Sequence, residues 1–454
     1  MEKGTTIGKE KLVALFDAGT FVETGAYIKR ADGELTGVVS GYGAVGGKLV
    51  YAFAQDSDRK KGAIDALQAE KIASLYAMAL KNGAPVVGMF DSAGAYVADG
   101  ASAMSAYGKL LKVIGDASGV IPQFALISGA CMGMAATAAS MFDVIVTVKE
   151  KSKLSVNAPF VVGKEVGSAD YAAQKGLASV CAENEAEALA VISKLIAWLP
   201  SNNEEGVTVE EQTDDINRTV SLDGLSGAAL IKELTDASDF VEIGSEYAKE
   251  MLTGFGIFGG VACGIVANNG VEKNGVITCD GAKKAAKLIG LCDAFSIPVI
   301  TLIDSEGVEV SSEAEEAALA AQLGKLAMAY ATASTAKITV VCKKAYGASF
   351  TLMGSKALGA DMVYALPKSE ISVMAPASAV AFLWNDQITP EVSRAELEEK
   401  WVKENASPEN AARDGSIDDV VDASELRQRI CSAVYMLMMK NAGAPVRKHC
   451  TLPL

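Results

Sequence analysis

A segment near the N-terminus recurs, in similar form, in the second half of the chain. Asp17-Ala-Gly-Thr-Phe-Val-Glu-Thr-Gly25 returns as Asp236-Ala-Ser-Asp-Phe-Val-Glu-Ile-Gly244. Further matches follow both copies in the same order and at nearly constant spacing: Gly41-Tyr-Gly43 with Gly254-Phe-Gly256, Lys71 with Lys284, Pro85 with Pro298, Asp91 with Asp304, Gly108-Lys-Leu110 with Gly324-Lys-Leu326, and Ser155-Val-Asn-Ala-Pro159 with Ser372-Val-Met-Ala-Pro376. Solenoid proteins repeat every ~20–45 residues, so a repeat this long indicates one duplicated domain.

Each copy alternates helical patterns with short buried strands. Val86–Phe90 and Val299–Ile303 are continuous apolar runs that follow a proline and end at an aspartate. Such runs are typical of strands buried on both faces of a parallel sheet. In the first copy a helix is predicted next at Ser105–Ala117 and a strand at Phe124–Ile127. In the second copy the corresponding helix is predicted at Glu316–Ala333 and the strand at Ile338–Val341. This alternation predicts an α/β fold.

The segment between the copies has a different composition. Glu183–Asp223 is acidic and polar, and it contains one helical pattern, at Ala186–Trp198. At about 150 residues per domain, a chain of 454 residues has room for two to four domains. We therefore expect an N-terminal domain over residues 1–200, an acidic linker over 201–223 and a C-terminal domain over 224–454.

The overall composition excludes several classes of protein. An apolar content of 50% with 21% charged residues is typical of a folded chain and excludes a disordered one. The net charge of −15 argues against a nucleic-acid-binding protein, which needs a basic face. The N-terminus lacks a secretory signal pattern, and no apolar run reaches the ~18 residues of a membrane helix. We therefore expect a cytoplasmic protein that does not insert into membranes by itself.

Histidine is almost absent, which restricts the possible chemistry. His449 is the single histidine, and none of the 8 cysteines belongs to a CxxC pair. These counts exclude most catalytic triads and histidine-based metal sites, and we predict no bound metal. Cys131 lacks a histidine nearby in the sequence, so we interpret it as a buried thiol and not as a nucleophile. Catalysis should therefore not depend on an imidazole.

Two small-residue turns between a strand and a helix are the candidate catalytic elements. They are Ser128–Ala136 and Lys343–Phe350, which occupy corresponding places in the two copies. Backbone N–H groups at the start of a helix lack intrahelical partners, and glycine allows a substrate oxygen to approach them closely. These are the requirements of an oxyanion hole. The alternative is that Gly133 and Gly347 serve only tight packing between strand and helix.

Polar residues at strand ends and cationic clusters are the candidate ligand contacts. Asp91-Ser-Ala-Gly94 and Asp304-Ser-Glu-Gly307 follow buried strands, where α/β folds place ligands. Their alternative role is to cap a loop. The clusters Arg59-Lys-Lys61, Lys283-Lys284 and Lys343-Lys344 are either solvated surface or contacts for phosphate groups such as those of coenzyme A. No Walker A or GxGxxG motif occurs in the chain.

The chain resembles the carboxyltransferase subunit of biotin-dependent acyl-CoA carboxylases and decarboxylases, of the propionyl-CoA carboxylase β type. The resemblance extends nearly from end to end. It rests on Leu15-Phe-Asp-Ala-Gly-Thr-Phe21, Asp91-Ser-Ala-Gly-Ala95, Ala117-Ser-Gly-Val-Ile-Pro-Gln123, Gly129-Ala-Cys-Met-Gly133, Leu199-Pro-Ser-Asn-Asn203, Gly264-Ile-Val-Ala-Asn268, Lys284-Ala-Ala, Phe295-Ser-Ile-Pro298, Lys344-Ala-Tyr-Gly347, Ser355-Lys-Ala-Leu-Gly-Ala-Asp361 and Arg447-Lys-His-Cys-Thr-Leu-Pro-Leu454. It implies tandem duplicated crotonase (ClpP-like) domains, in agreement with the internal repeat.

The resemblance also implies a reaction and its components. A carboxyl group moves between biotin, attached to a separate carrier protein, and an acyl-CoA of the propionyl/methylmalonyl, acetyl/malonyl or glutaconyl type. Biotin supplies the base, so no histidine is required. The implied partners are a biotin carboxyl carrier protein and either a biotin carboxylase or a membrane decarboxylase subunit. A homo-oligomer, from dimer to hexamer, is expected, with the acyl-CoA on the first domain and biotin on the second.

The family's site residues transfer to this chain by position. Gly133 and Met134 are the implied amide donors of the first oxyanion hole, and Ala348 and Ser349 those of the second. Thr351 falls where the family adjusts its acyl pocket. The predicted substrate-binding residues are Ser92, Ala93, Gly94, Gly129, Gly347, Thr351, Lys71 and Lys284.

The chain departs from the family pattern at four places. Met134 replaces a second glycine, and Ala348-Ser349-Phe350 replaces Gly-Ala-Tyr. Tyr96 stands where the family has an arginine, and Ser305-Glu-Gly307 with the acidic stretch after it replaces a proline-glycine loop. Two alternatives follow, namely a non-catalytic scaffold subunit of a biotin-dependent complex and a crotonase-fold acyl-CoA hydrolase or isomerase. The latter needs an acidic side chain beside the first turn, which Gly129–Ala136 does not supply.

Overall fold

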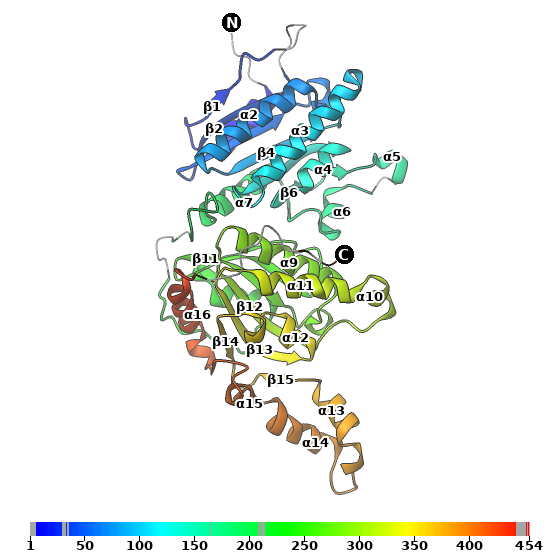
Figure 1. The fold of residues 1–454 in the computed structure, drawn as a ribbon, viewed down its shortest axis with the longest axis vertical. Coiled ribbons are helices and arrows are strands. Elements are labelled where there is room, and N and C mark those ends of the chain that lie inside the picture. The colour runs from blue at the N-terminus through cyan, green and yellow to red at the C-terminus, as the bar shows by residue number, and fades with distance from the viewer. Residues whose placement is uncertain are drawn as a thin grey trace. The chain divides into compact units, whose positions relative to one another are not determined.

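The computed structural model divides the chain into two compact units, Met1–Gly206 (unit 1) and Val207–Leu454 (unit 2) (Figure 1). His449 and the residues next to it lie outside the part of the chain that the structure describes. The structure describes residues 6–29, 33, 36–163, 165–207, 209, 214–441, 451 and 453.

Unit 1 is built on an eight-stranded sheet in the order β1-β2-β3-β4-β5-β6-β8, with β7 paired to β5. The first three strands pair antiparallel, and the remaining pairs are parallel. The strands are β1 (Val22–Thr24), β2 (Val38–Val45), β3 (Lys48–Gln55), β4 (Val86–Ser92), β5 (Gln123–Met132), β6 (Val144–Val148), β7 (Lys153–Ser155) and β8 (Val180–Ala182). The helices are α1 (Ile7–Leu15), α2 (Ala66–Asn82), α3 (Ala101–Ala117), α4 (Met134–Ser140), α5 (Pro159–Val162), α6 (Ala169–Gln174) and α7 (Glu185–Trp198).

Unit 2 repeats this topology, with the strand order β16-β14-β13-β12-β11-β10-β9 and β15 paired to β13. Its strands are β9 (Phe240–Glu242), β10 (Met251–Phe258), β11 (Val261–Asn268), β12 (Val299–Ser305), β13 (Lys337–Tyr346), β14 (Met362–Ala365), β15 (Glu370–Ser372) and β16 (Asp419–Val420). Its helices are α8 (Gly227–Leu234), α9 (Cys279–Ala294), α10 (Ser312–Glu316), α11 (Leu319–Thr332), α12 (Ala348–Leu352), α13 (Pro376–Leu383), α14 (Arg394–Trp401), α15 (Pro408–Arg413) and α16 (Ala423–Leu437).

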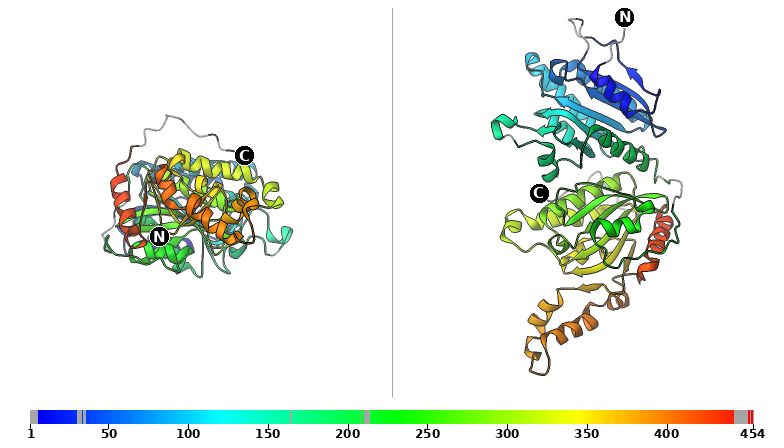
Figure 2. Two further views of the ribbon diagram at one scale, coloured as in Figure 1. Left: turned by 90° about the horizontal axis from the view of Figure 1, so that it is seen from below. Right: turned by 180° about the vertical axis from the view of Figure 1, so that it is seen from behind.

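Helices cover both faces of each sheet. In unit 1, α2, α3 and α4 pack with the sheet into one apolar core, and α1 and α7 contact the strands as well. In unit 2, α8 and α16 bury apolar side chains against the sheet, while α9 contacts β10 and β11. The view from behind shows the ribbons of α8, in green, and α16, in red, beside the sheet (Figure 2). The predicted strands at Val86–Phe90 and Val299–Ile303 are confirmed as β4 and β12. The predicted α/β layering is therefore confirmed.

The repeated aspartates Asp17 and Asp236 cap equivalent hairpin turns. Asp17 accepts hydrogen bonds from the amides of Gly46 and Gly47 (3.1 and 2.9 Å), between β2 and β3. Asp236 accepts bonds from Gly259 and Gly260 (3.0 and 2.8 Å), between β10 and β11. The two N–H groups of a tight hairpin turn need acceptors, which explains the recurrence of the aspartate in both copies.

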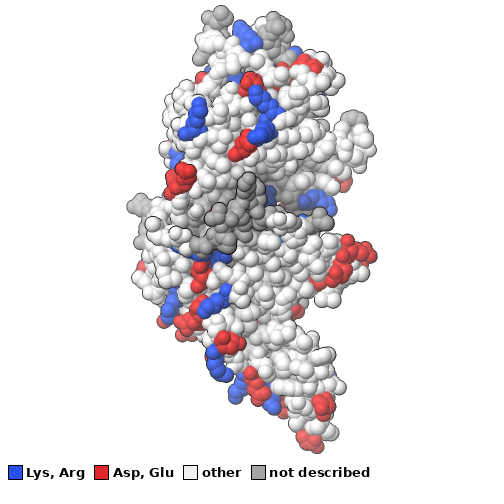
Figure 3. All heavy atoms as spheres, in the orientation of Figure 1, with Lys and Arg blue, Asp and Glu red and all other residues white. Residues whose placement is uncertain are grey.

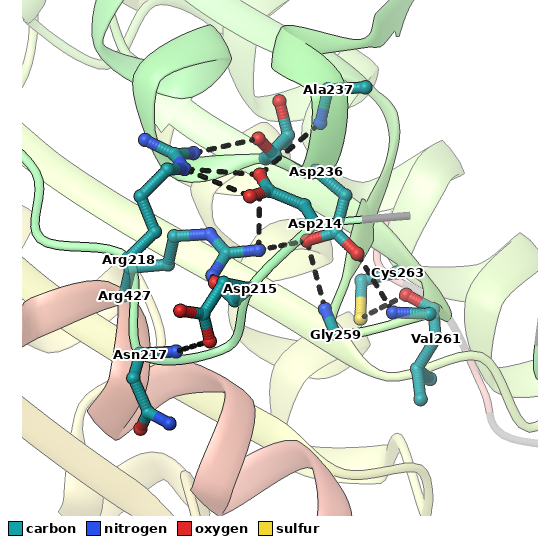
Figure 4. Close-up of polar contacts among 12 residues, drawn as sticks. Asp214, Asp215, Asn217, Arg218, Asp236, Ala237, Gly259, Val261, Cys263 and Arg427 are labelled. Carbon is teal, nitrogen blue, oxygen red and sulfur yellow. Dashed lines mark hydrogen bonds and ion pairs between the residues drawn. The ribbon is translucent and has the colours of Figure 1, made fainter. Parts of the chain in front are cut away.

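Unit 2 adds a buried cation to this cap (Figure 4). Arg427 of α16 is 0% exposed and forms ion pairs with Asp236 and Asp214. Arg218 binds the carboxylate of Asp214 in turn, through its Nε atom at 3.1 Å. The described residues of the predicted linker from 214 onward thus pack into unit 2 through charged groups. Asp17, by contrast, is exposed at the surface of unit 1.

Unit 2 also carries a helical insertion that unit 1 lacks at the corresponding place. Between β15 and α15 it has α13, α14 and a π-helical turn at Val402–Ala406, whereas α5 and α6 follow β7 in unit 1. The rings of Trp384 and Trp401 pack edge to face at 5.1 Å inside the insertion. The indole N–H of Trp401 donates to Ser372 Oγ at 3.3 Å, which ties the insertion to β15.

Candidate functional site

The two predicted turns have almost the same backbone conformation. Gly133 links β5 to α4 with φ 63° and ψ −133°, and Gly347 links β13 to α12 with φ 57° and ψ −132°. Residues with a Cβ atom rarely adopt this region, so both positions require glycine. The repeat therefore preserves a backbone geometry, and not merely a small residue beside a helix.

The amide of each turn glycine is already engaged in a hydrogen bond. Gly133 N–H donates to the carbonyl of Ser155 at 3.1 Å, and Gly347 N–H donates to Ser372 at 2.9 Å. Both acceptors lie on the short strands β7 and β15, which pair with the ends of β5 and β13. This bond corrects the sequence-based assignment of Gly133 as an amide donor, because its N–H is not free to meet a ligand.

The next two amides in each turn differ from the glycine amide. Met134 and Ala135 in unit 1, like Ala348 and Ser349 in unit 2, are the first helical residues, whose N–H groups have no intrahelical acceptor. Within the described part of the chain, none of these four amides donates a hydrogen bond. Ala135 was missed by the sequence analysis, although the repeat aligns it with Ser349.

The predicted strand-end residues lie beside the turns. Ser92 pairs in register with Cys131 of β5, and its hydroxyl accepts a hydrogen bond from Gly94 N–H at 3.2 Å. Ser305 and Gly307 form the same turn in unit 2, also at 3.2 Å. Gly94 and Gly307 have φ values of 109° and 127°, which again favour glycine. Ala93 lies between Ser92 and Gly94 and is exposed.

The side chains around the two turns differ in charge. Small neutral residues precede the first turn at Gly129 and Ala130, and the corresponding residues of the second turn are Lys343 and Lys344. Glu306, which corresponds to Ala93, binds Lys344 Nζ at 2.7 Å. An ion pair thus stands at the second turn where the corresponding residues of the first turn, Ala93 and Ala130, are neutral.

Tyr346 and Glu370 add a phenol and a carboxylate to the surroundings of the second turn. Tyr346 donates a hydrogen bond to the carboxylate of Glu370, and burial raises the pKa of this tyrosine, with a further contribution from that carboxylate. Glu313 and Glu315 stand on α10, where Figure 3 shows acidic side chains gathered on the surface. In unit 1, Lys60 Nζ lies 4.4 Å from the ring centre of Tyr96, the residue that replaces the family's arginine.

A pocket of about 610 Å³ opens beside the second turn. Its walls include Gly347, Ala348 and Thr351 on one side and residues of the helical insertion and α15 on the other. Polar groups contributed by this second side are Asn405, Ser407, Asn410, Asp414 and Ser416. The predicted residues Gly347, Ala348 and Thr351 thus line one cavity, whereas Ser349 is buried and its hydroxyl donates to the carbonyl of Tyr346 at 2.8 Å.

The predicted lysines Lys71 and Lys284 point into the protein. Lys71 Nζ donates to the carbonyl of Val38 at 2.9 Å, and Lys284 Nζ donates to that of Tyr247 at 2.7 Å. The two residues are only 6% and 8% exposed. Burial lowers the pKa of both lysines to about 8, because it removes water from the charged ammonium group, and Glu23 and Glu242 oppose the shift.

Neither a metal-binding cluster nor a membrane-spanning helix occurs among the described residues. No group of three or more His, Cys, Asp or Glu side chains in this part of the chain could hold a metal ion. No helix in it combines the length and the apolar character that are needed to cross a bilayer. Cys131 is 0% exposed, and burial raises the pKa of its thiol, in agreement with its interpretation as a core residue.

Comparison with known proteins shows the family. The model of the carboxyl transferase domain matches residues 1–452. The methylmalonyl-CoA decarboxylase subunit alpha of Veillonella parvula is 34% identical over 100% of this chain and 94% of its own length. The propionyl-CoA carboxylase beta chain of Roseobacter denitrificans is 33% identical, with the same coverage.

A solved structure shows the same fold. The transcarboxylase 12S, described as a hexamer with methylmalonyl-coenzyme A and methylmalonic acid bound, has a TM-score of 0.93 and 31% identity over 100% of this chain and 94% of that one. The predicted tandem crotonase-like fold is therefore confirmed. The chain belongs to the carboxyl transferase domain family and is a biotin-dependent carboxyltransferase.

Proposed function

We propose that this chain transfers a carboxyl group between biotin on a separate carrier protein and an acyl-CoA, with unit 1 binding the acyl-CoA and unit 2 the biotin. The observation that carries the proposal is the pair of glycine turns, each of which has two backbone amides without an acceptor among the described residues. The family membership supplies the reaction class, and the turns supply donors that need no histidine.

In unit 1, the amides of Met134 and Ala135 would hold the thioester oxygen of the acyl-CoA. Negative charge develops on this oxygen when the α-carbon loses its proton, and fixed amides stabilise it without reorganisation. Loss of one such donor costs about 2.7–4 kcal/mol of transition-state stabilisation. Gly129 and Ala130, which precede this turn, carry neither a charge nor a long side chain.

In unit 2, the amides of Ala348 and Ser349 would hold the ureido oxygen of biotin. The pocket beside Gly347 and Ala348, with polar groups such as those of Asn405 and Asn410, suits a polar ring system. Biotin, when bound, supplies the ring nitrogen that carries the carboxyl group and accepts the α-proton. The residues of this unit orient that ring and limit the access of water to it.

The relatives support methylmalonyl-CoA and propionyl-CoA as the first pair of substrates to test. Proteins named for the decarboxylation and for the carboxylation are about equally similar to this chain, at 34% and 33% identity. The same amides stabilise both directions of a reversible transfer, so the partners decide the direction. We propose a biotin carboxyl carrier protein with either a biotin carboxylase or a membrane decarboxylase subunit, and a homo-oligomeric assembly like that described for the transcarboxylase 12S.

A direct assay tests the proposal. The purified chain is mixed with methylmalonyl-CoA, and propionyl-CoA is measured with biotinylated carrier protein, with free biotin and without biotin. We expect product only when biotin is present, and faster with the carrier. Turnover without biotin would indicate a hydrolase or decarboxylase of another mechanism. No turnover of methylmalonyl-CoA or malonyl-CoA with an authentic carrier would contradict the proposal in favour of a scaffold role.

A further inference from the structure

A lysine ties three elements together behind the first turn. Lys11 of α1 forms an ion pair with Asp91 at the end of β4 (3.3 Å), and its Nζ atom donates to Ser128 Oγ on β5 (2.9 Å). The other carboxylate oxygen of Asp91 accepts a hydrogen bond from the amide of Ala130 at 3.2 Å. The side chains of Lys11 and Asp91 are only 13% and 15% exposed. The junction thus joins the first helix, the strand-end aspartate and the strand that leads into the turn.

Unit 2 joins the three corresponding elements, but its lysine belongs to the strand and not to the helix. Lys343 belongs to β13 and lies 3.6 Å from Asp304 at the end of β12. Its Nζ atom donates to the carbonyl of Leu225 at 3.1 Å and to Ser226 Oγ at 3.4 Å, at the start of α8. In unit 1 the lysine extends from α1 to β4 and β5, whereas in unit 2 it extends from β13 to β12 and the start of α8.

Local packing explains the exchange. A Cβ atom added at Gly129, which corresponds to Lys343, would lie 2.2 Å from Asp91 Oδ1, so β5 cannot carry the lysine at this position. Conversely, the repeat aligns Lys11 with Leu230 of α8, which is 7% exposed and belongs to the apolar core of unit 2. Each unit therefore keeps the cation at the junction but places it on the element that has room for it.

We propose that Lys11 and Lys343 are positioning residues for the two amide turns. Recurrence of one ionic junction from two different sequence positions indicates that the junction itself is required. Asp91 fixes Ala130, and β5 continues from Ala130 through Gly133 to the amides of Met134 and Ala135. Lys11 neutralises and orients the Asp91 carboxylate, so it sets the place of these donors without touching a ligand. This proposal rests on the proposed function of the turns.

The proposal predicts a change in the catalytic rate constant without a change in substrate affinity. Misplacement of a reacting group by ~1 Å costs about 100-fold in rate. We therefore expect Lys11→Met to lower kcat by about 10- to 100-fold with less than about a twofold change in KM, and Lys11→Arg to restore most of the rate. Lys343→Met should have a smaller effect, because its side chain is 45% exposed and its ion pair is longer.

A charge-balancing variant and an exchange measurement complete the test. The double variant Lys11→Met/Asp91→Asn removes the unpaired charge and keeps an acceptor for Ala130, so it should recover part of the kcat lost in Lys11→Met. An unchanged kcat in Lys11→Met, or a double variant that is no better than Lys11→Met, would overturn the proposal.

Amide hydrogen exchange measures the positioning independently of activity. Exchange in the peptide 128–136 should be faster in Lys11→Met than in the wild type, while exchange in 343–350 should be unchanged, and Lys343→Met should show the reverse pattern. Equal exchange in all three proteins would overturn the proposal. Because this result does not depend on turnover, failure of the positioning role is distinguishable from failure of the proposed function.

Discussion

The two amide turns have the same backbone and different surroundings. Gly133 and Gly347 differ by only a few degrees in φ and ψ, and each glycine amide is held by a serine carbonyl of a short strand. Ala93 and Ala130 at the first turn are small and neutral, whereas Glu306 and Lys344 at the corresponding places of the second turn form an ion pair. The backbone of the turn is therefore preserved in both units, while these neighbouring side chains have diverged.

The hairpin caps differ as strongly, and their comparison leads to the largest expected effect. Replacement of Arg427 by methionine leaves Asp236 buried without a cation, which costs about 3–5 kcal/mol of unfolding free energy. Denaturant unfolding of the variant should show this loss in unit 2 only. The matched change in unit 1 is Asp17→Ala, which removes an exposed cap and should cost about 0.5–2 kcal/mol, by analogy with helix caps. An unchanged unfolding free energy of unit 2 in Arg427→Met would contradict the stabilising role of the buried arginine.

Replacement of Gly133 or Gly347 by alanine tests how far the two turns differ in the space around their backbones. A residue with a Cβ atom in this conformation costs on the order of 1–3 kcal/mol in strain. Gly347→Ala should be the more destabilising, because the new Cβ atom would lie 3.2 Å from the carbonyl of Val373, whereas at Gly133 no atom of the described residues, apart from its chain neighbours, lies within 4 Å. Thermal unfolding of both variants measures the difference. A greater loss in Gly133→Ala would contradict the close approach seen at the second turn.

The buried lysines should behave alike in both units, and their effect depends on pH. Lys71 and Lys284 release a proton at pH about 8 when folded, and near the ordinary value of 10.5 when unfolded. The unfolded state therefore binds more protons between these values, and stability rises with pH in this window. From pH 7.5 to 9, each lysine should contribute about 1 kcal/mol to this rise. Urea unfolding at both pH values should show a smaller rise in Lys71→Met and in Lys284→Met. If the stability of both variants depended on pH in the same way as that of the wild type, the lowered pKa values would be contradicted.

The architecture could be predicted because the repeat shows itself in patterns among residues that are close together in the sequence. The apolar runs that became β4 and β12 and the glycines of both turns are visible without any knowledge of distant contacts. The hydrogen bond from Gly133 to Ser155 is different, because it depends on the pairing of β7 with β5. Sequence patterns do not show which carbonyl meets a given amide, so the hydrogen bond of the Gly133 amide could not be predicted. The alignment of Ala135 with Ser349 in the repeat is the signal that points to Ala135 as a further candidate donor.

The ionic junction behind the turns was beyond sequence reasoning for another reason. Lys11 and Asp91 belong to elements that are far apart in the chain, and their counterparts Leu230 and Asp304 do not repeat the pair. The cation of unit 2 is supplied by Lys343, which the sequence analysis placed in a cationic cluster that is either solvated surface or a contact for phosphate groups. A repeat in space that is not a repeat in sequence becomes visible only when both units are compared as structures.

The most direct test of the account removes a single backbone donor at the first turn. Met134 is the first residue of α4, a position where proline fits the helix and removes only the N–H group. Met134→Ala loses the same side chain but keeps the amide and serves as the control. Biotin-dependent decarboxylation of methylmalonyl-CoA should fall by about 10²–10³-fold in Met134→Pro and stay within a few-fold of the wild type in Met134→Ala. Equal activity of the two variants, with both folded, would contradict catalysis by this backbone amide.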